Sequence, residues 1–233
     1  AQAAEGDWPT YGHDKGGMRH SPLSQITPQN VQNLTPAWVY HLRPAEAQVG
    51  TDRDEAARRV AEGAAPTGRR FSNSQTTPLV VGGRMFITTP YSRVVALDPA
   101  TGKELWVYQV GGTGQPSTRG VEYWSGGKGD APRIVFGTRD GRLIALDAAT
   151  GAPAKGFGVD GVVNLKTPEV MQNHPNASLG LTSPPTVWKD LIITGSAVPE
   201  FPALGPAGDV RAWDVRTGKL VWTFHSIPRE GEP

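Results

Sequence analysis

Hydrophobic residues stand in short runs along most of the chain, and Gly, Pro, Asp or Lys separates one run from the next. Runs of this kind, rich in Val, Ile, Leu and Thr, are typical of antiparallel β-hairpins. Three pairs of runs are joined by short turns: 78–81 with 84–89, 133–138 with 142–146, and 185–188 with 191–195. Together with the apolar runs 93–97 and 220–224, these pairs predict an all-β chain.

The strand pattern is interrupted between residues 43 and 74. The segment just before the interruption, Ala37–Tyr40, has the composition of an outer strand. Within the interruption, the sequence of residues 54–63 predicts a two-turn helix that stops at Gly63. We interpret residues 43–74 as a surface insertion in the first repeat region and assign no chemistry to them.

A short turn sequence, Asp-x-x-Thr-Gly, occurs three times, each time after an apolar run. The copies begin at Asp98, Asp147 and Asp214, at intervals of about 50 and 70 residues. In the first and third copies a tryptophan follows at one fixed offset, whereas the second copy has Lys155 at that offset. A single copy would be an ordinary hairpin turn, but three copies indicate a repeat architecture.

The repeat predicts how neighbouring units pack. A carboxylate that accepts backbone N–H bonds stabilises a tight turn, and glycine suits the left-handed position that closes it. A tryptophan at a fixed place on the outer strand can pack on the turn of the next unit, which is the arrangement of a β-propeller. We therefore predict that Trp106 and Trp222 are buried, and that the chain forms about three blades after an opening strand near Trp8–Tyr11.

Composition narrows the classes of function. The chain has 23 Lys and Arg against 22 Asp and Glu, a net charge of +1, so no basic excess points to nucleic acid. It has no cysteine, which excludes disulfides, Cys-ligated zinc and a covalently attached c-type haem. No apolar run has the length of a membrane helix. The small residues Ala1–Ala4 fit either the mature side of a signal-peptidase cut or a disordered end.

Beyond the repeat, six segments of the chain resemble the pyrroloquinoline quinone (PQQ)-dependent dehydrogenases. Within this family, the chain most resembles the branch of periplasmic and membrane-bound glucose and polyol dehydrogenases. The resemblance covers essentially the whole chain and implies an eight-bladed propeller, of which residues 1–233 form about the first half. It also implies a PQQ–calcium pair on the propeller axis. The segments are 7–12, 75–79, 118–124, 181–185, 208–214 and 220–228.

The resemblance implies four site residues. Gln75 matches a Glu or Gln that touches a cofactor carboxylate or a neighbouring polar group, and Arg119 matches the Arg that reaches the quinone and carboxylate edge of PQQ. Thr182 matches a hydroxyl that bonds a PQQ carboxylate, and Glu200 matches a carboxylate ligand of the calcium ion. The chemistry is consistent with these roles, because PQQ carries three carboxylates that need guanidinium, amide or hydroxyl donors. Calcium in turn prefers carboxylate and carbonyl oxygens.

The chain departs from the family pattern at one place. Methanol-oxidising members carry adjacent cysteines there, whereas this chain has Thr113 and Gly114, with Gln115 as the nearest polar residue. The methanol type is therefore disfavoured. The resemblance places the catalytic base, a stacking Trp and further calcium ligands in later blades, so no catalytic residue is assigned in this chain.

Two functions follow as alternatives. The first is a part of a periplasmic dehydrogenase that oxidises a sugar, polyol or other alcohol and passes electrons to a quinone or cytochrome. This enzyme would need the remaining half of the propeller as a second chain or a missing C-terminal part. The second is a non-enzymatic propeller scaffold of the same superfamily. Only the enzyme hypothesis predicts that Arg119, Thr182 and Glu200 lie in one axial pocket.

Overall fold

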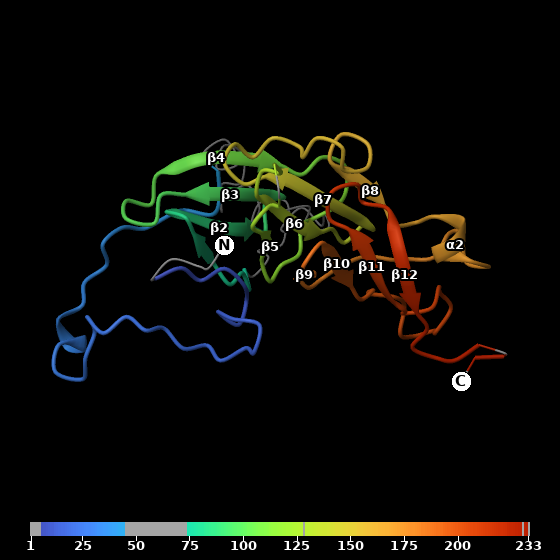
Figure 1. The fold of residues 1–233 in the computed structure, drawn as a ribbon, viewed down its shortest axis with the longest axis horizontal. Coiled ribbons are helices and arrows are strands. Elements are labelled where there is room, and N and C mark those ends of the chain that lie inside the picture. Colours follow the sequence, from blue (N-terminus) through green and yellow to red (C-terminus); the bar gives the residue numbers. More distant parts are fainter. Residues whose placement is uncertain (1–5, 45–73, 128, 230, 233) are drawn as a thin grey trace, which may run out of the picture.

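Three four-stranded antiparallel sheets form the body of the computed structural model, which describes residues 6–44, 74–127, 129–229 and 231–232 (Figure 1). The first sheet consists of β1 (Leu79–Val81), β2 (Arg84–Thr89), β3 (Arg93–Leu97) and β4 (Glu104–Gln109). The second consists of β5 (Glu122–Trp124), β6 (Arg133–Gly137), β7 (Arg142–Asp147) and β8 (Val162–Asn164). The third consists of β9 (Thr186–Trp188), β10 (Leu191–Thr194), β11 (Val210–Asp214) and β12 (Leu220–Phe224).

The predicted all-β class is thus confirmed, since helical structure is limited here to the 3-10 turn η1 (Val31–Asn33) and the short α2 (Pro168–Met171) within the described residues. None of the helices in this part of the chain has the length and apolarity needed to span a membrane. The helix predicted at 54–63, and with it nearly all of the proposed insertion, lies outside the described residues.

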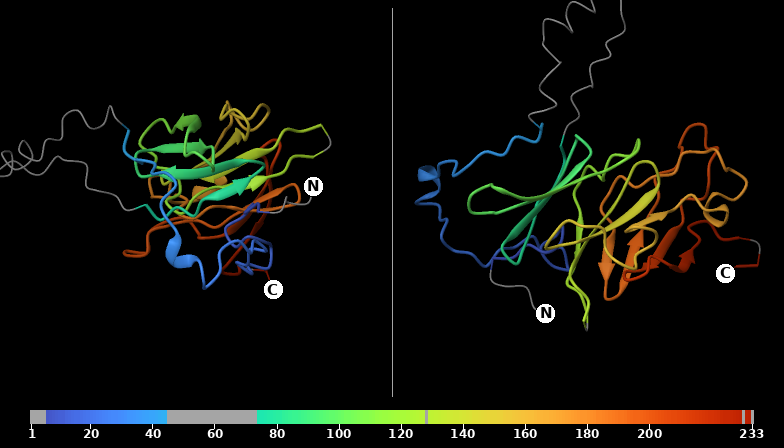
Figure 2. Two further views of the ribbon diagram at one scale, coloured as in Figure 1. Left: turned by 90° about the vertical axis from the view of Figure 1, so that its left-hand side faces the viewer. Right: turned by 90° about the horizontal axis from the view of Figure 1, so that it is seen from above.

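The sheets stand side by side and bury both faces of the middle one, as the view from above in Figure 2 shows. Every residue of β6 is buried because its alternate side chains face opposite neighbours. Ile134 and Phe136 pack in a cluster with Phe86 and Trp106 of the first sheet. Val135 packs in a second cluster that holds residues of the third sheet, such as Trp213.

The repeated turn has one geometry in all three sheets. The carboxylate of Asp98 accepts three hydrogen bonds, from the N–H groups of Ala100 and Thr101 at 2.9 Å and from the Thr101 hydroxyl at 3.0 Å. These bonds hold the pKa of Asp98 below its usual range, and the bond from the Thr101 hydroxyl has the largest effect. The turns at Asp147 and Asp214 repeat the same three bonds.

Tryptophan rings dock on two of these turns. Trp106 lies on the backbone of Gly151, and its indole N–H donates to the Ala148 carbonyl at 3.2 Å. Trp38 lies in the same way on Gly102, but residues 37–40, predicted as an outer strand, form no strand in the structure. Trp106 is only 9% exposed, which confirms the prediction that it is buried on an outer strand.

One expectation about the repeat is wrong. Trp222 is 39% exposed, because the described residues contain no sheet after β12 whose turn the indole could cover. The second sheet has Lys155 at the offset of the docking tryptophan, so another residue must cover the next turn. The chain makes a detour before β8, and Val163 and Phe157 pack on Gly218 instead. Their apolar side chains replace the missing ring.

The N-terminal segment crosses the first strands of all three sheets. Trp8 exchanges two backbone hydrogen bonds with Val80 of β1, so the predicted opening strand is a single bridge. Further along, the Thr10 hydroxyl donates to the carboxylate of Glu122 in β5, and Lys15 donates to the Val187 carbonyl in β9. This segment therefore ties the sheets together along the edge formed by β1, β5 and β9.

We expect Trp106→Ala to lower the free energy of unfolding by about 3–5 kcal/mol, because it leaves a cavity between two sheets and an unpaired carbonyl at Ala148. The neighbouring Val107 is exposed, so Val107→Ala should cost less than about 1 kcal/mol. Denaturant unfolding of both variants measures this difference. Similar losses in the two would contradict the docking role of the indole.

We also expect Gly151→Ala to be more damaging than Gly156→Ala. Both glycines have a positive φ, +72° and +78°, so both substitutions carry the same backbone strain. A methyl group on Gly151 would lie 2.6 Å from the Trp106 ring, whereas one on Gly156 would meet nothing within 4 Å. The first variant should lose at least about 2 kcal/mol more stability than the second in thermal or denaturant unfolding.

Candidate functional site

The loops that lead into β1, β5 and β9 lie along one edge of the three sheets and are bonded to one another. The backbone N–H of Thr77 donates to the Arg119 carbonyl at 3.2 Å. The hydroxyl of Ser117 donates to the Thr182 carbonyl at 3.0 Å. Positions that are far apart in sequence, 77, 119 and 182, are therefore neighbours in a continuous row.

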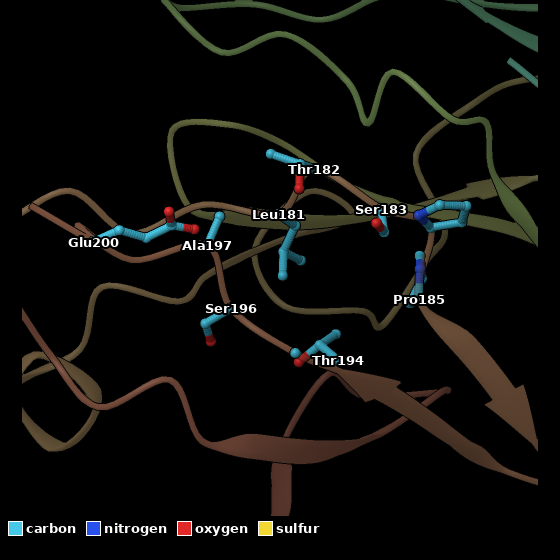
Figure 3. Close-up of a pocket in the computed structure, with 10 residues that line it drawn as sticks. Leu181, Thr182, Ser183, Pro185, Thr194, Ser196, Ala197 and Glu200 are labelled. Atoms are coloured by element: carbon cyan, nitrogen blue, oxygen red, sulfur yellow. The ribbon is translucent and has the colours of Figure 1, made fainter. Parts of the chain in front are cut away.

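A cavity of about 370 Å³ opens in the third sheet at this edge (Figure 3). Two loops form its walls, one leading into β9 and one following β10, and they are joined by paired backbone bonds between Gly180 and Ala197. The lining residues are Leu181, Thr182, Ser183, Pro184, Pro185, Thr194, Gly195, Ser196, Ala197 and Glu200. Both Thr182 and Glu200, predicted from the sequence, thus line one cavity.

Arg119 reaches this cavity from the second sheet. Its Nη1 atom donates to the hydroxyl of Ser183, which lines the cavity, at 3.2 Å. The next residue, Gly120, has a φ of +115°, and a Cβ there would lie 3.0 Å from the Thr77 carbonyl. Glycine therefore allows the Arg119 loop to pass close to the loop of the first sheet.

Gln75 lies in the row of loops but does not line the cavity. It is exposed, two residues before Thr77, whose N–H meets the Arg119 carbonyl. The structure therefore places Thr182 and Glu200 in one cavity, brings Arg119 to Ser183 in its wall, and leaves Gln75 in the loop of the first sheet. The cofactor and metal roles assigned to all four residues remain predictions.

The functional groups around the cavity suit an anionic ligand with a hard cation. A guanidinium and several hydroxyls can donate to carboxylates, and Glu200 offers a carboxylate oxygen to a cation such as calcium. In the described ranges, no three His, Cys, Asp or Glu side chains cluster closely enough to hold a metal. Glu200 would therefore need oxygen ligands from elsewhere to complete a calcium shell.

The chain is closely packed at Gly114, which with Thr113 stands at the position where methanol-oxidising members of the resembled family carry adjacent cysteines. Gly114 is buried against the Asp140 carboxylate, which forms an ion pair with Arg142 at 2.9 Å. The carbonyl of Gln115 accepts the Arg139 N–H at 3.0 Å. A side chain larger than hydrogen at position 114 would displace this ion pair, so the turn between β6 and β7 determines the residue type there.

Sequence reasoning missed Glu122, a buried carboxyl at the start of β5 that is only 4% exposed. Burial raises its pKa to about 7, against the hydrogen bond from Thr10, the charge of Lys15 and the backbone N–H of Val187, which all lower it. A single acidic residue inside the otherwise apolar and aromatic run 121–124 was the available signal. Its partners, however, come from the distant N-terminal segment.

Comparison with known proteins agrees with the fold. Residues 8–233 match the family described as "PQQ: Glucose/ethanol/alcohol dehydrogenase, beta-propeller domain". Quinoprotein glucose dehydrogenase A from Acinetobacter calcoaceticus is 34% identical over 98% of this chain and 30% of its own length. The glycerol dehydrogenase large subunit of Gluconobacter oxydans is 34% identical over 96% of this chain and 29% of its own.

Among solved structures, quinohemoprotein alcohol dehydrogenase from Comamonas testosteroni superposes with a TM-score of 0.69 at 31% identity, over 97% of this chain and 28% of that chain. The chain therefore belongs to the family of PQQ-dependent glucose, ethanol and alcohol dehydrogenase propellers. It spans less than a third of the length of the relatives named here.

We expect Glu122→Gln to change how stability depends on pH. The folded carboxyl keeps its proton up to about pH 7, whereas the unfolded one loses it near 4.5. The contribution of Glu122 is therefore most favourable below pH 4.5 and is lost as the pH rises to 7, on the order of 3 kcal/mol in all. The amide does not titrate. Unfolding curves should therefore show the free energy of unfolding of the variant rising relative to that of the wild type as the pH increases across this range. A constant difference would contradict the buried-carboxyl assignment.

Proposed function

We propose that this chain is the N-terminal part of the propeller of a PQQ- and calcium-dependent dehydrogenase. The substrate is a sugar, a polyol or another alcohol, and the electron acceptor is a quinone or a cytochrome. The relatives include glucose, glycerol and alcohol dehydrogenases, which supports this range of substrates. The remaining part of the propeller completes the site, in line with the short span of this chain in its relatives.

One observation carries the proposal: Thr182 and Glu200 line a single cavity, and the guanidinium of Arg119 bonds Ser183 in its wall. These residues come from two different sheets and from three segments of the sequence. A guanidinium, hydroxyls and a carboxylate at one place form a donor set for a polycarboxylate with its cation. Arg119 and Thr182 would bind cofactor carboxylates, Gln75 would contribute an amide from the first sheet, and Glu200 would hold calcium.

When bound, PQQ supplies a quinone that accepts the electron pair of a substrate C–H bond, and calcium makes that quinone more electrophilic. The residues of this chain bind and orient. Arg119 would place positive charge beside bound PQQ, and Thr182 would hold one carboxylate by a hydrogen bond. The base that removes the substrate proton is not assigned to this chain. A periplasmic location belongs to the same proposal and rests on the family resemblance.

The scaffold alternative needs the same blades but no charged groups at the axial edge. A scaffold does not need a guanidinium, a hydroxyl and a carboxylate around this cavity, and the exposed bond between Arg119 and Ser183 stabilises the fold little. The shared row of loops therefore favours the enzyme over the scaffold.

Absorbance titration of the full-length protein with PQQ, in the presence of calcium, tests the proposal. We expect saturable binding, and we expect Arg119→Ala to weaken it by roughly 10- to 100-fold, because a charge-assisted bond to a carboxylate is lost. Arg84 follows the β1–β2 turn, at the end of this hairpin that lies away from the loop leading into β1, so Arg84→Ala is the matched control and should bind normally. No binding by the wild type, or equal losses in both variants, would overturn the proposal.

A further inference from the structure

Ser117 is a fully buried polar residue in the loop before β5, with 0% of its surface exposed. Its N–H donates to the Gly137 carbonyl at 2.9 Å, which fixes its backbone to β6. Its hydroxyl donates to the Thr182 carbonyl at 3.0 Å, in the loop that leads into β9. This side chain therefore joins the second sheet to the wall of the cavity.

We propose that Ser117 is a positioning residue that sets Thr182 and Arg119 in register for binding the carboxylates of the cofactor. The inference rests on the proposed function, and it adds a residue to which the family resemblance assigns no role. Ser117 is too deeply buried to touch a ligand, so it acts through its two neighbours.

The bonds around Thr182 show how the hydroxyl of Ser117 acts. The N–H of Leu181 donates to the Thr138 carbonyl at 2.9 Å, which fixes the chain just before Thr182. The bond from Ser117 fixes the carbonyl of Thr182 itself. With both sides held, the peptide plane of Thr182 has one orientation, and its side chain, which is exposed, lines the cavity.

The same residue anchors the loop of Arg119. The N–H of Gly120 closes a turn on the carbonyl of Ser117 at 3.4 Å, so Arg119 lies within that turn. The guanidinium then reaches Ser183, the residue after Thr182. Ser117 thus holds the backbone on both sides of the gap that the Arg119 side chain spans, and loss of its hydroxyl would let the two loops move apart. Ligand binding would then have to order them, which lowers affinity.

A double-mutant cycle in the full-length protein tests this role, with PQQ and calcium as the probe and absorbance as the readout. We expect Ser117→Ala to weaken PQQ binding roughly tenfold. In a Thr182→Val background the hydroxyl that Ser117 positions is gone, so adding Ser117→Ala should weaken binding much less, by roughly twofold. Ser125 is an exposed serine just after β5, and Ser125→Ala should leave binding unchanged in both backgrounds.

The outcomes separate this inference from the proposed function. If the wild type does not bind PQQ, the proposed function fails, and the role of Ser117 fails with it. If the wild type binds but Ser117→Ala has no effect, or the two substitutions are simply additive, only the positioning role is wrong. If Ser117→Ala does not fold, Ser117→Cys replaces it, because a thiol of similar size is a weaker donor and should give an intermediate affinity. Wild-type affinity in that variant would contradict the role.

Discussion

The contact between an indole ring and a glycine of the neighbouring turn is the constraint on which the rest of this structure depends. Trp38 packs on Gly102 and Trp106 packs on Gly151, each at a distance that leaves no room for a Cβ atom. In both places the indole N–H also donates to a carbonyl in the turn, at 3.1 and 3.2 Å. The aspartate, threonine and glycine of the turn shape the surface that the ring needs, so the repeated residues act as one unit.

This stacking has a direct consequence for the candidate site. Because each sheet is held to the next at its outer strand, the first strands of the sheets line up at the opposite edge, where β5 contacts β9. The loops before these strands then meet, joined by the backbone bond from Thr77 to Arg119 and by the bond from the Ser117 hydroxyl to Thr182. The N-terminal segment reinforces the same edge through Thr10 and Lys15. Side chains distant in sequence are thereby brought to one cavity without any long element to position them.

Local patterns in the sequence predict most of the fold. Apolar runs and turn residues indicate the strands, and the Asp-x-x-Thr-Gly repeat with Trp106 indicates the stacked blades. The departures from the repeat have long-range causes. Val163 packs on Gly218 because of the detour before β8, and Trp222 is exposed because no described sheet follows β12.

The candidate site is less accessible to such reasoning. The resemblance to a family, and no local pattern, pointed to Arg119, Thr182 and Glu200, and the structure then brings them to one place. Glu122 and Ser117 were not predicted, because their partners lie in distant segments of the chain. A serine before a turn is ordinary in sequence, and only its complete burial and its bond to Thr182 distinguish it.

The central claim is that stacked blades gather Arg119, Thr182 and Glu200 into a cofactor site. A crystal or cryo-electron microscopy structure of the full-length protein with PQQ and calcium tests it most directly. The account predicts cofactor carboxylates within hydrogen-bond distance of Arg119 and Thr182, and a calcium ion coordinated by Glu200. A cofactor bound elsewhere, with these three side chains away from it, would contradict the account.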